Sequence, residues 1–461
     1  MTGIRDTQQN RRMDADEPHN ARLLRVYTLD EAQRSLLRRV PLDELGVPEV
    51  VQHRITELFG QPLTPDEAVR HIIADVRARG DEALQDWSAR LDGAQLVRLH
   101  VSPEEIAAGL AATPPPVVAA LQLAAERIEH FHRRQPLGGW WDATGQERLG
   151  QLVRPLERVG IYVPGGTAPL PSSLLMCAIP ARVAGVREIV VCTPPGRNGL
   201  PPVLLAAAHM AQVDKVFQLG GAQAIAALAY GTASVPRVDK IVGPGNLFVT
   251  LAKRQVYGAV GIDGLLGPTE TMIIADGGAN PEYIAADLLA QAEHDVLAQA
   301  ILLTPSRPLA AAVADAVERR ARLLSRQAII EQSLAGRGGA VIVPDLAAAF
   351  EIANAFAPEH LQLCLSEAEQ WLDRVQHAGA VFLGEYSFEV LADYVAGPSH
   401  SLPTGGSARY ASGLSVRDFI KLVSVINLSA ATAQQLAEPA ACLAHAEGLT
   451  AHAAAAEARR I

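Results

Sequence analysis

Short apolar runs alternate with longer helix-like stretches through the middle of the chain. Runs such as "REIVVCTPP" (187–195) and "DKIVGPG" (239–245) are rich in Ile and Val and end in Pro or Gly. These features are typical of short buried strands. The stretches between them, such as "LPPVLLAAAHMAQ", have the length and composition of helices. This alternation predicts a parallel sheet that is covered by helices on both faces.

A second series of the same kind follows the first. It contains the apolar runs "TMIIADGG" (271–278), "AQAILLTPS" (298–306), "GAVIVPD" (339–345) and "AGAVFLG" (378–384). We therefore predict an α/β fold with two tandem doubly wound, Rossmann-like parallel-sheet domains, a helical N-terminal part and a small helical C-terminal tail. The expected segments are a disordered extension (1–22), a helical segment that packs with the second α/β domain (23–157), the first domain (158–268), the second domain (269–426) and a tail that contacts a partner subunit (427–461).

Charge and cysteine content narrow the class of protein. The formal net charge is -10 and no basic tract interrupts it, which disfavours binding to nucleic acid or to an anionic membrane. The four cysteines lie far apart without a CxxC pair, which favours a reducing compartment. The N-terminus has no apolar core region and no apolar stretch reaches membrane-spanning length. We expect a cytoplasmic protein.

Glycine-rich loops follow the strands of the first series. "YVPGGTAPLPSS", "LGGAQA" and "VGPGNLF" each lead into a helix N-terminus, where free N–H groups favour phosphate. In open parallel sheets, ligands bind beyond the carboxyl ends of the strands. The GxGxxG fingerprint is absent, so tight turns without a nucleotide explain these loops equally well.

Two pairs of polar residues suggest proton transfer or metal binding. Gln291 and His294 stand three positions apart in "LLAQAEHDVLAQA", a spacing that places them on one face of a helix. Either a polar helix flank or half of a metal site fits this spacing. Glu359 and His360 are adjacent in "APEHL", and a carboxylate beside an imidazole suits proton transfer. Spacing alone does not assemble a metal site from these residues.

Seven motifs taken together resemble the histidinol dehydrogenase family. They are "ERVGIYVPGGTAPLPSSLLMCAIPARVAGV", "LGGAQAIAALAYGT", "VGPGN", "AQAEHD", "APEHLQL", "DYVAGPSHSLPT" and "EGLTAH". The resemblance runs from about residue 24 to 460. It implies an NAD-linked homodimer with one Zn²⁺ per subunit, which oxidises L-histidinol to L-histidine through L-histidinal in histidine biosynthesis.

The resemblance also assigns roles to residues. It implies the zinc ligands Gln291, His294, Asp393 and His452, the proton-transfer pair Glu359 and His360, and the NAD contacts Tyr162, Gln223 and Asn246. The implied substrate contacts are Thr269, Gln291, His294, His360, Asp393, Glu447 and His452. In the family the C-terminal segment crosses to the partner, so that Glu447 and His452 complete the neighbouring site. His360 would accept the hydroxyl proton, and Glu359 would activate the water that hydrates the aldehyde.

Some positions depart from the family pattern. Thr269 replaces a common Ser, Ala392 a usual Gly, and Ser399 a common Asn. These three departures leave an alternative open: a related zinc- and NAD-dependent dehydrogenase of the same fold that oxidises another alcohol, such as a hydroxylated sulfonate. A metal-dependent hydrolase or lyase without a nucleotide is the rival from another class. For His400 two roles remain open, contact with substrate or water and a structural role in its loop.

Overall fold

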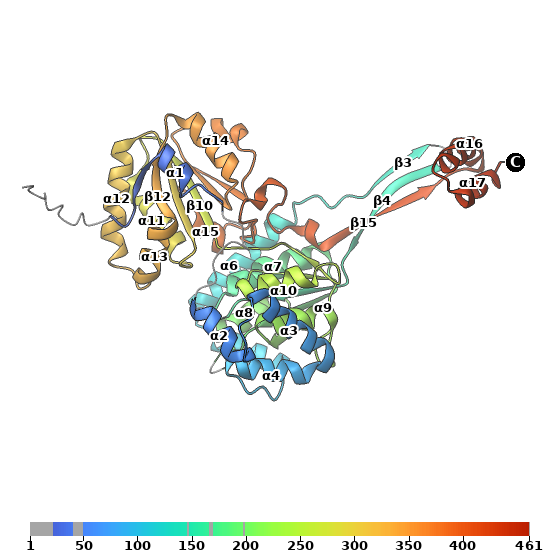
Figure 1. The fold of residues 1–461 in the computed structure, drawn as a ribbon, viewed down its shortest axis with the longest axis horizontal. Helices are drawn as coiled ribbons and strands as arrows, with labels where there is room; N and C mark the ends of the chain where they lie inside the picture. Colours follow the sequence, from blue (N-terminus) through green and yellow to red (C-terminus); the bar gives the residue numbers. More distant parts are fainter. Residues whose placement is uncertain (1–21, 40–48, 145–146, 166–168, 197–198, 461) are drawn as a thin grey trace, which may run out of the picture.

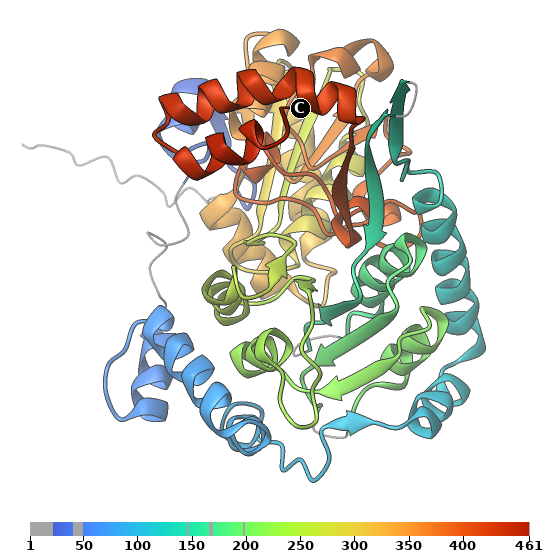
Figure 2. The same ribbon diagram turned by 90° about the vertical axis from the view of Figure 1, so that its right-hand side faces the viewer.

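The computed structural model describes residues 22–39, 49–144, 147–165, 169–196 and 199–460. Two α/β units lie next to each other, each built on a six-stranded sheet, and a narrow arm projects away from them (Figures 1 and 2). The expected N-terminal extension, 1–22, lies outside the described residues except for Arg22. The two tandem Rossmann-like sheets expected from the sequence are present.

The first sheet has the strand order β2-β7-β6-β5-β8-β9. It consists of β2 (His100–Val101), β5 (Arg158–Tyr162), β6 (Glu188–Thr193), β7 (Lys215–Gln218), β8 (Lys240–Val242) and β9 (Gly261–Ile262). All neighbours are parallel except β2, which pairs antiparallel with β7 at one edge. After the edge strand β2, the chain enters the middle of the sheet with β5 and winds first to one side (β6, β7) and then to the other (β8, β9), which is the doubly wound pattern.

Helices cover both faces of the first sheet. They are α7 (Pro171–Ala184), α8 (Pro202–Met210), α9 (Gly221–Tyr230) and α10 (Leu247–Val256), together with the N-terminal helices α2 (Glu49–Phe59), α3 (Pro65–Arg79), α4 (Asp81–Asp92), α5 (Pro103–Ala112) and α6 (Pro115–His132). A capping box at Thr64 and Glu67 fixes the start of α3. Among the described residues no single helix is long and apolar enough to span a membrane, and only α5 and α6, bent by 114°, pass that test as a pair.

The second sheet repeats this winding and is parallel throughout. Its order is β1-β12-β11-β10-β13-β14, with β1 (Val26–Thr28), β10 (Glu270–Ala275), β11 (Gln299–Thr304), β12 (Gly338–Ile342), β13 (His360–Cys364) and β14 (Ala380–Leu383). Its helices are α1 (Leu29–Arg34), α11 (Pro281–Ala292), α12 (Arg307–Ala321), α13 (Gln327–Arg337), α14 (Leu346–Phe356) and α15 (Glu389–Tyr394). Three 3₁₀ helices, η1 (Ala368–Arg374), η2 (Ser407–Arg409) and η3 (Val416–Phe419), lie in the connections. Strands β10 and β11 are buried along their whole length, as their continuous apolar runs predict.

The expected helical segment 23–157 divides between the two units and the arm. Of the described elements of this segment, β1 and α1 belong to the second unit, where Val26 of β1 pairs with Ala340 of β12. Helices α3, α5 and α6 pack instead on α9, α8 and α7 of the first unit. The expectation that the whole segment packs with the second domain is therefore corrected. The reason is that the apolar faces of α3 and α4 are buried in the same core as β7 and α9.

The arm is a separate three-stranded antiparallel sheet with two helices at its far end. It contains β3 (Trp140–Thr144), β4 (Glu147–Pro155) and β15 (Ile420–Asn427), and β15 pairs with β4 from Ile420–Pro155 to Asn427–Arg148. Helices α16 (Ala430–Ala446) and α17 (Thr450–Glu457) pack on each other beyond these strands. Figure 1 shows both helices well away from the two α/β units.

Candidate active site

Glu359 and His360 lie where the chain enters the second sheet. Helix α14 ends at Phe356, and Ala357 adopts a left-handed conformation with φ 52° and ψ 66°. The chain then enters β13, and the side chains of Glu359 and His360 are 6% and 4% exposed. Thr269 precedes the neighbouring strand β10. These residues therefore meet at the amino ends of β10 and β13, not at the carboxyl ends where ligands were expected in this sheet.

His360 is held in one neutral tautomer. Its Nδ1 lies 3.1 Å from the carbonyl oxygen of Glu270, which can only accept a hydrogen bond, so Nδ1 carries the proton. Burial lowers the pKa of the imidazole, although the charge of Asp393 opposes this shift. The lone pair therefore resides on Nε2, which is the form that can accept a proton from a substrate.

Glu359 is a buried carboxyl group with two donors. The hydroxyl of Thr269 donates to Glu359 Oε2 at 2.7 Å, and the backbone N–H of Glu270 donates to the same oxygen at 3.0 Å. Burial raises the pKa of Glu359 well above its usual range, and the carboxylates of Glu270 and Glu389 raise it further. A carboxyl group with a raised pKa is a stronger base when it is ionised.

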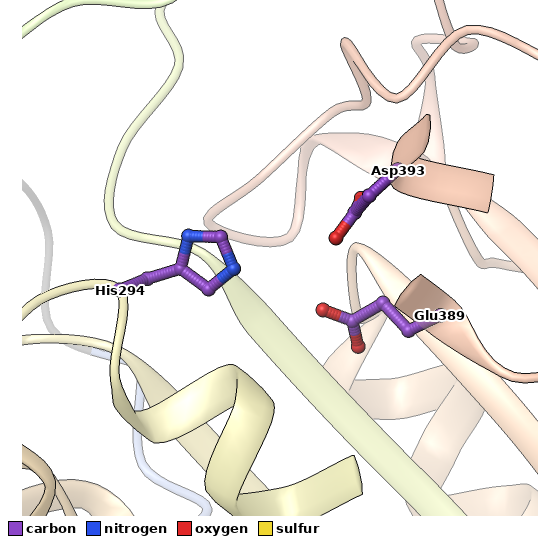
Figure 3. Close-up of side chains that lie close together, drawn as sticks. All are labelled: His294, Glu389 and Asp393. Atoms are coloured by element: carbon purple, nitrogen blue, oxygen red, sulfur yellow. The ribbon is translucent and has the colours of Figure 1, made fainter. Parts of the chain in front are cut away.

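Three side chains beside this pair can hold a metal ion. One ligand atom each of His294, Glu389 and Asp393 lies within 4.8 Å of the others. Figure 3 shows the ring of His294 facing the two carboxylates, which extend from α15. Burial raises the pKa of Glu389 to about 8 and that of Asp393 to about 7. Partial desolvation by the surrounding residues lowers the pKa of His294, as does the nearby ring of His360. A neutral imidazole between two carboxyl groups is a ligand set for a divalent metal.

Gln291 and His294 flank the end of α11. The helix ends at Ala292, so Gln291 belongs to its last turn and His294 lies just beyond, with its backbone N–H bonded to the Gln291 carbonyl at 3.3 Å. The two residues do not share a continuous helical face as predicted. The Gln291 side chain is fully buried, its Oε1 lies 3.4 Å from the Thr269 hydroxyl, and its Nε2 has no partner among the described residues. This amide therefore reaches the same group of residues as Glu359.

His400 has a structural position in its loop. Its Nδ1 donates to the carbonyl oxygen of Asp393 at 2.9 Å, so its Nε2 accepts from the hydroxyl of Ser173 at 3.1 Å. Burial lowers the pKa of His400 to about 4. Both ring nitrogens are thus used within the protein, and this favours the structural role over contact with substrate. The residue links α7 of the first unit to α15, which carries Asp393.

Arg39 fixes the turn that leads to Glu359. Its guanidinium forms a two-pronged pair with Glu270, donates to Phe356 O at 2.6 Å and to Ala357 O at 3.3 Å, and stacks 3.6 Å over the Phe356 ring. Glu270 is 4% exposed, and its backbone N–H is one of the two donors to Glu359. Arg39 therefore holds both the left-handed turn and the strand that contacts Glu359.

Arg39→Ala is expected to lower both stability and turnover. The change leaves the buried Glu270 carboxylate without its partner, which costs about 3 kcal/mol in the free energy of unfolding. It also frees the turn before Glu359, so kcat should fall about tenfold. Urea unfolding and steady-state kinetics measure the two effects, with Arg25→Ala as the control because Arg25 is exposed near β1. A variant as stable and active as Arg25→Ala would contradict the role of Arg39.

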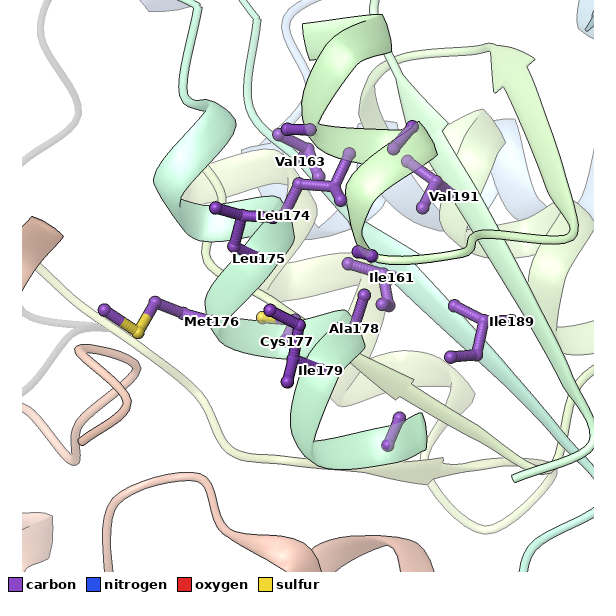
Figure 4. Packing of buried hydrophobic residues seen from close by; sticks show 14 of the residues in the cluster. Ile161, Val163, Leu174, Leu175, Met176, Cys177, Ala178, Ile179, Ile189 and Val191 are labelled. Atoms are coloured by element: carbon purple, nitrogen blue, oxygen red, sulfur yellow. The ribbon is translucent and has the colours of Figure 1, made fainter. Parts of the chain in front are cut away.

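The three residues assigned to NAD line one cavity of the first unit. Tyr162 ends β5, Gln223 lies in the first turn of α9, and Asn246 caps α10 by accepting from the N–H of Val249 at 3.2 Å. The Tyr162 hydroxyl accepts from the N–H of Gly221 at 3.1 Å. Figure 4 shows the apolar core that packs between β5 and α7. The carboxyl-end loops expected from the sequence do meet here.

Glu447 and His452 do not reach the metal-binding group within one chain. Glu447 follows α16 and His452 lies in α17, both at the far end of the arm, whereas His294 and Asp393 lie in the second unit (Figure 1). The structure therefore brings together Gln291, His294, Asp393, Thr269, Glu359 and His360 but leaves these two residues apart.

Sequence reasoning missed two residues of the site. Glu389 stands four positions before Asp393 on α15, and this spacing on one helix face was a usable signal. Arg39 gave no such signal, because its partner Glu270 lies 231 positions away in the chain.

Known proteins are similar to this chain in sequence and in architecture. A family model described as histidinol dehydrogenase matches residues 62–460. The histidinol dehydrogenase of Deinococcus radiodurans is 50% identical over 434 residues, covering 93% of this chain and 98% of that protein. The histidinol dehydrogenase of Moorella thermoacetica is 54% identical over 395 residues, which cover 85% of this chain and 93% of that protein.

A crystal structure of histidinol dehydrogenase from Elizabethkingia anophelis has a TM-score of 0.86 and 34% identity, and the match covers 96% of this chain and 99% of that one. These comparisons do not support the alternative of a sibling enzyme that acts on another alcohol. The match extends over both α/β units and the arm, and the chain belongs to the histidinol dehydrogenase family.

Proposed function

We propose that the chain is a zinc-dependent, NAD-linked dehydrogenase that oxidises L-histidinol to L-histidine through L-histidinal. Its family places it among the oxidoreductases of histidine biosynthesis. The observation that carries the finer proposal is the convergence of His294, Glu389 and Asp393 within 4.8 Å, beside the buried pair Glu359 and His360. This arrangement combines a metal-binding group with two bases of different kinds.

The donor set fits zinc. His294 offers an imidazole nitrogen and Asp393 a carboxylate oxygen. Gln291 offers the amide oxygen Oε1, which among the described residues has only a long contact of 3.4 Å with the Thr269 hydroxyl. Glu389 lies close enough to be a further ligand or to balance the charge of the ion. Bound there, zinc would supply a fixed positive charge that holds the amino alcohol in place.

His360 is the proposed acceptor of the hydroxyl proton. Its Nδ1–H is bonded to Glu270, so its free Nε2 can take the proton as the carbinol is oxidised. NAD would take up the hydride in each of the two oxidations. The burial of His360 keeps it neutral before the reaction, and the charge of Asp393 stabilises the protonated form afterwards.

Glu359 is the proposed base for hydration of the aldehyde. Its Oε2 is held by Thr269 and Glu270, which leaves the other carboxylate oxygen free of these two bonds and able to accept a proton from water. Gln291 and Thr269 lie within hydrogen-bond distance of each other at 3.4 Å, and both would contact the substrate. His360 then accepts the second proton when the hydrated aldehyde is oxidised.

We further propose a homodimer in which the arm completes the partner's site. The arm exposes large apolar side chains along its strands and helices: Trp140, Trp141, Leu149, Leu422, Val423, Ile426, Leu436, Leu443 and Leu449. Exposed apolar side chains gathered on one projecting element favour an interface between subunits. Docking on a second copy would cover this surface and bring Glu447 and His452 of the partner subunit to His294 and Asp393.

NADH formation with L-histidinol tests the proposed reaction. The rate with L-histidinol should exceed that with other alcohols, including a hydroxylated sulfonate, by orders of magnitude in kcat/KM. Two equivalents of NADH should form for each L-histidinol consumed. A preference for another alcohol, or no reduction of NAD with any of them, would contradict the proposal.

Zinc binding to the metal-free protein should release roughly one proton per site at pH 7. The pKa of Asp393 is raised to about 7 and that of Glu389 to about 8, so both carboxyl groups are partly protonated before the ion binds. The cation favours their charged forms, so the protons leave and zinc affinity rises with pH between about 6 and 8. Calorimetry in buffers of different ionisation enthalpy measures the release. Affinity that is constant over this range would contradict the assignment.

A further inference from the structure

A cavity of about 320 Å³ lies in the first α/β unit, away from the proton-transfer pair. Its described walls come from α2, α3, α4, the loops after β5 and β6, the start of α9 and the start of α10. Tyr162, Gln223 and Asn246 line it, and no residue of the second sheet does. This volume lies within the range of sites that bind small molecules.

Asp92 faces this cavity with an unused oxygen. It is the last residue of α4, which ends at Gly93 in a left-handed conformation. Its Oδ2 is buried and has no hydrogen-bond partner among the described residues. Burial raises the pKa of Asp92 to about 6, although the nearby charge of Arg54 lowers it. A buried carboxylate without a partner is costly, and a ligand that donates hydrogen bonds removes this cost.

Gln223 presents a second unused group in the same cavity. The residue is fully buried, and neither its Oε1 nor its Nε2 has a partner among the described residues. Arg54, by contrast, uses its guanidinium to donate to the Leu91 carbonyl at 3.1 Å. The cavity therefore offers an acceptor carboxylate and an amide that both accepts and donates, which suits a nucleoside with a free ribose diol.

We propose that Asp92 accepts hydrogen bonds from the hydroxyls of the adenosine ribose of NAD and thereby selects NAD over its 2′-phosphorylated form. This inference rests on the proposed NAD dependence. A carboxylate is an acceptor only, so it matches a 2′-hydroxyl and repels a 2′-phosphate. An acidic residue has this task in many dinucleotide-binding sheets, although the usual glycine fingerprint is absent from this chain.

The adenosine half is assigned to this cavity by exclusion. The nicotinamide ring must lie beside His360 to take up a hydride, and His360 belongs to the second sheet. Among the described residues, those that line the cavity belong to the first unit and the N-terminal helices. Gln223 is then placed to contact the adenine ring or the second ribose hydroxyl.

Direct binding of four nucleotides to the full-length protein tests the proposal. NAD, NADP, 5′-ADP and 2′-deoxy-5′-ADP are titrated by calorimetry into the wild type, Asp92→Asn and Glu82→Gln. Glu82 is an exposed carboxylate on the same helix and serves as the matched control. The wild type and Glu82→Gln should bind NAD at least about tenfold more tightly than NADP, and 5′-ADP about tenfold more tightly than 2′-deoxy-5′-ADP. In Asp92→Asn the preference for NAD over NADP should fall to about twofold or less, because the negative charge is lost. The preference for 5′-ADP should decrease only in part, because the asparagine oxygen can still accept a hydrogen bond.

The outcomes separate the inference from the proposed function. NAD binding with unchanged preferences in Asp92→Asn overturns the role of Asp92 and leaves the NAD-linked reaction standing. No binding of NAD to the wild type overturns both. The comparison of 5′-ADP with 2′-deoxy-5′-ADP on the wild type needs no variant, and equal binding of the two overturns the inference even if Asp92→Asn does not fold.

Discussion

His294→Ala is expected to lose bound zinc and more than a hundredfold of its activity, an effect of about 3 kcal/mol or more on the barrier. The ring faces the carboxylates of Glu389 and Asp393, and its removal takes the only imidazole out of this three-residue group. The residue is exposed in the single chain, so the change leaves no cavity in the core. Elemental analysis and steady-state kinetics on the purified protein measure the two losses.

His209→Ala is the matched control, because His209 is an exposed histidine on α8. It should retain full metal content and activity. Circular dichroism and thermal unfolding should show that both variants keep the wild-type fold. Stoichiometric zinc in His294→Ala would contradict the assignment of this residue as a ligand.

Glu359→Gln is expected to separate the two oxidations. The glutamine oxygen can still accept from Thr269 and Glu270, so the local structure is retained, but the amide cannot take a proton from water. Oxidation of L-histidinal should fall at least about a hundredfold, whereas oxidation of L-histidinol should fall less than about tenfold. Transient kinetics started from L-histidinol or from L-histidinal measure the rates of the two oxidations separately.

The control for this variant is Glu367→Gln, an exposed carboxylate after β13 that should leave both halves unchanged. If Glu359→Gln lowered the rates of the two oxidations equally, the proposal that Glu359 acts specifically in the hydration of the aldehyde would be contradicted.

The periodicity of the chain was enough to predict both sheets. The apolar runs that form β10 and β11 are buried along their whole length, as their composition predicts. The position of the N-terminal segment was not predictable in this way. Helix α3 packs on α9 of the first unit, whereas strand β1 pairs with β12 of the second unit. The local sequence pattern contains no information on such distant partners.

The site shows the same division. Glu359 and His360 were visible because they are adjacent, and Glu389 could have been found from its spacing to Asp393. The clamp by Arg39 depends on a partner 231 positions away. His452 lies on the arm because β15 pairs with β4. The two strands are far apart in the sequence, so the sequence pattern does not reveal this pairing.

Mixed subunits test the central claim, that each site takes His294 and Asp393 from one chain and His452 from the other. Neither His294→Ala nor His452→Ala should be active alone. In random mixtures half of the dimers are hybrids with one intact site of two, so activity should return to about a quarter of wild type.

His294→Ala mixed with Asp393→Ala is the control and should stay inactive, because both changes lie in the same half-site. Recovery of activity in the first mixture and not in the second supports the shared site. No recovery in the first mixture, with hybrids verified by mass, would show that each site belongs to a single chain.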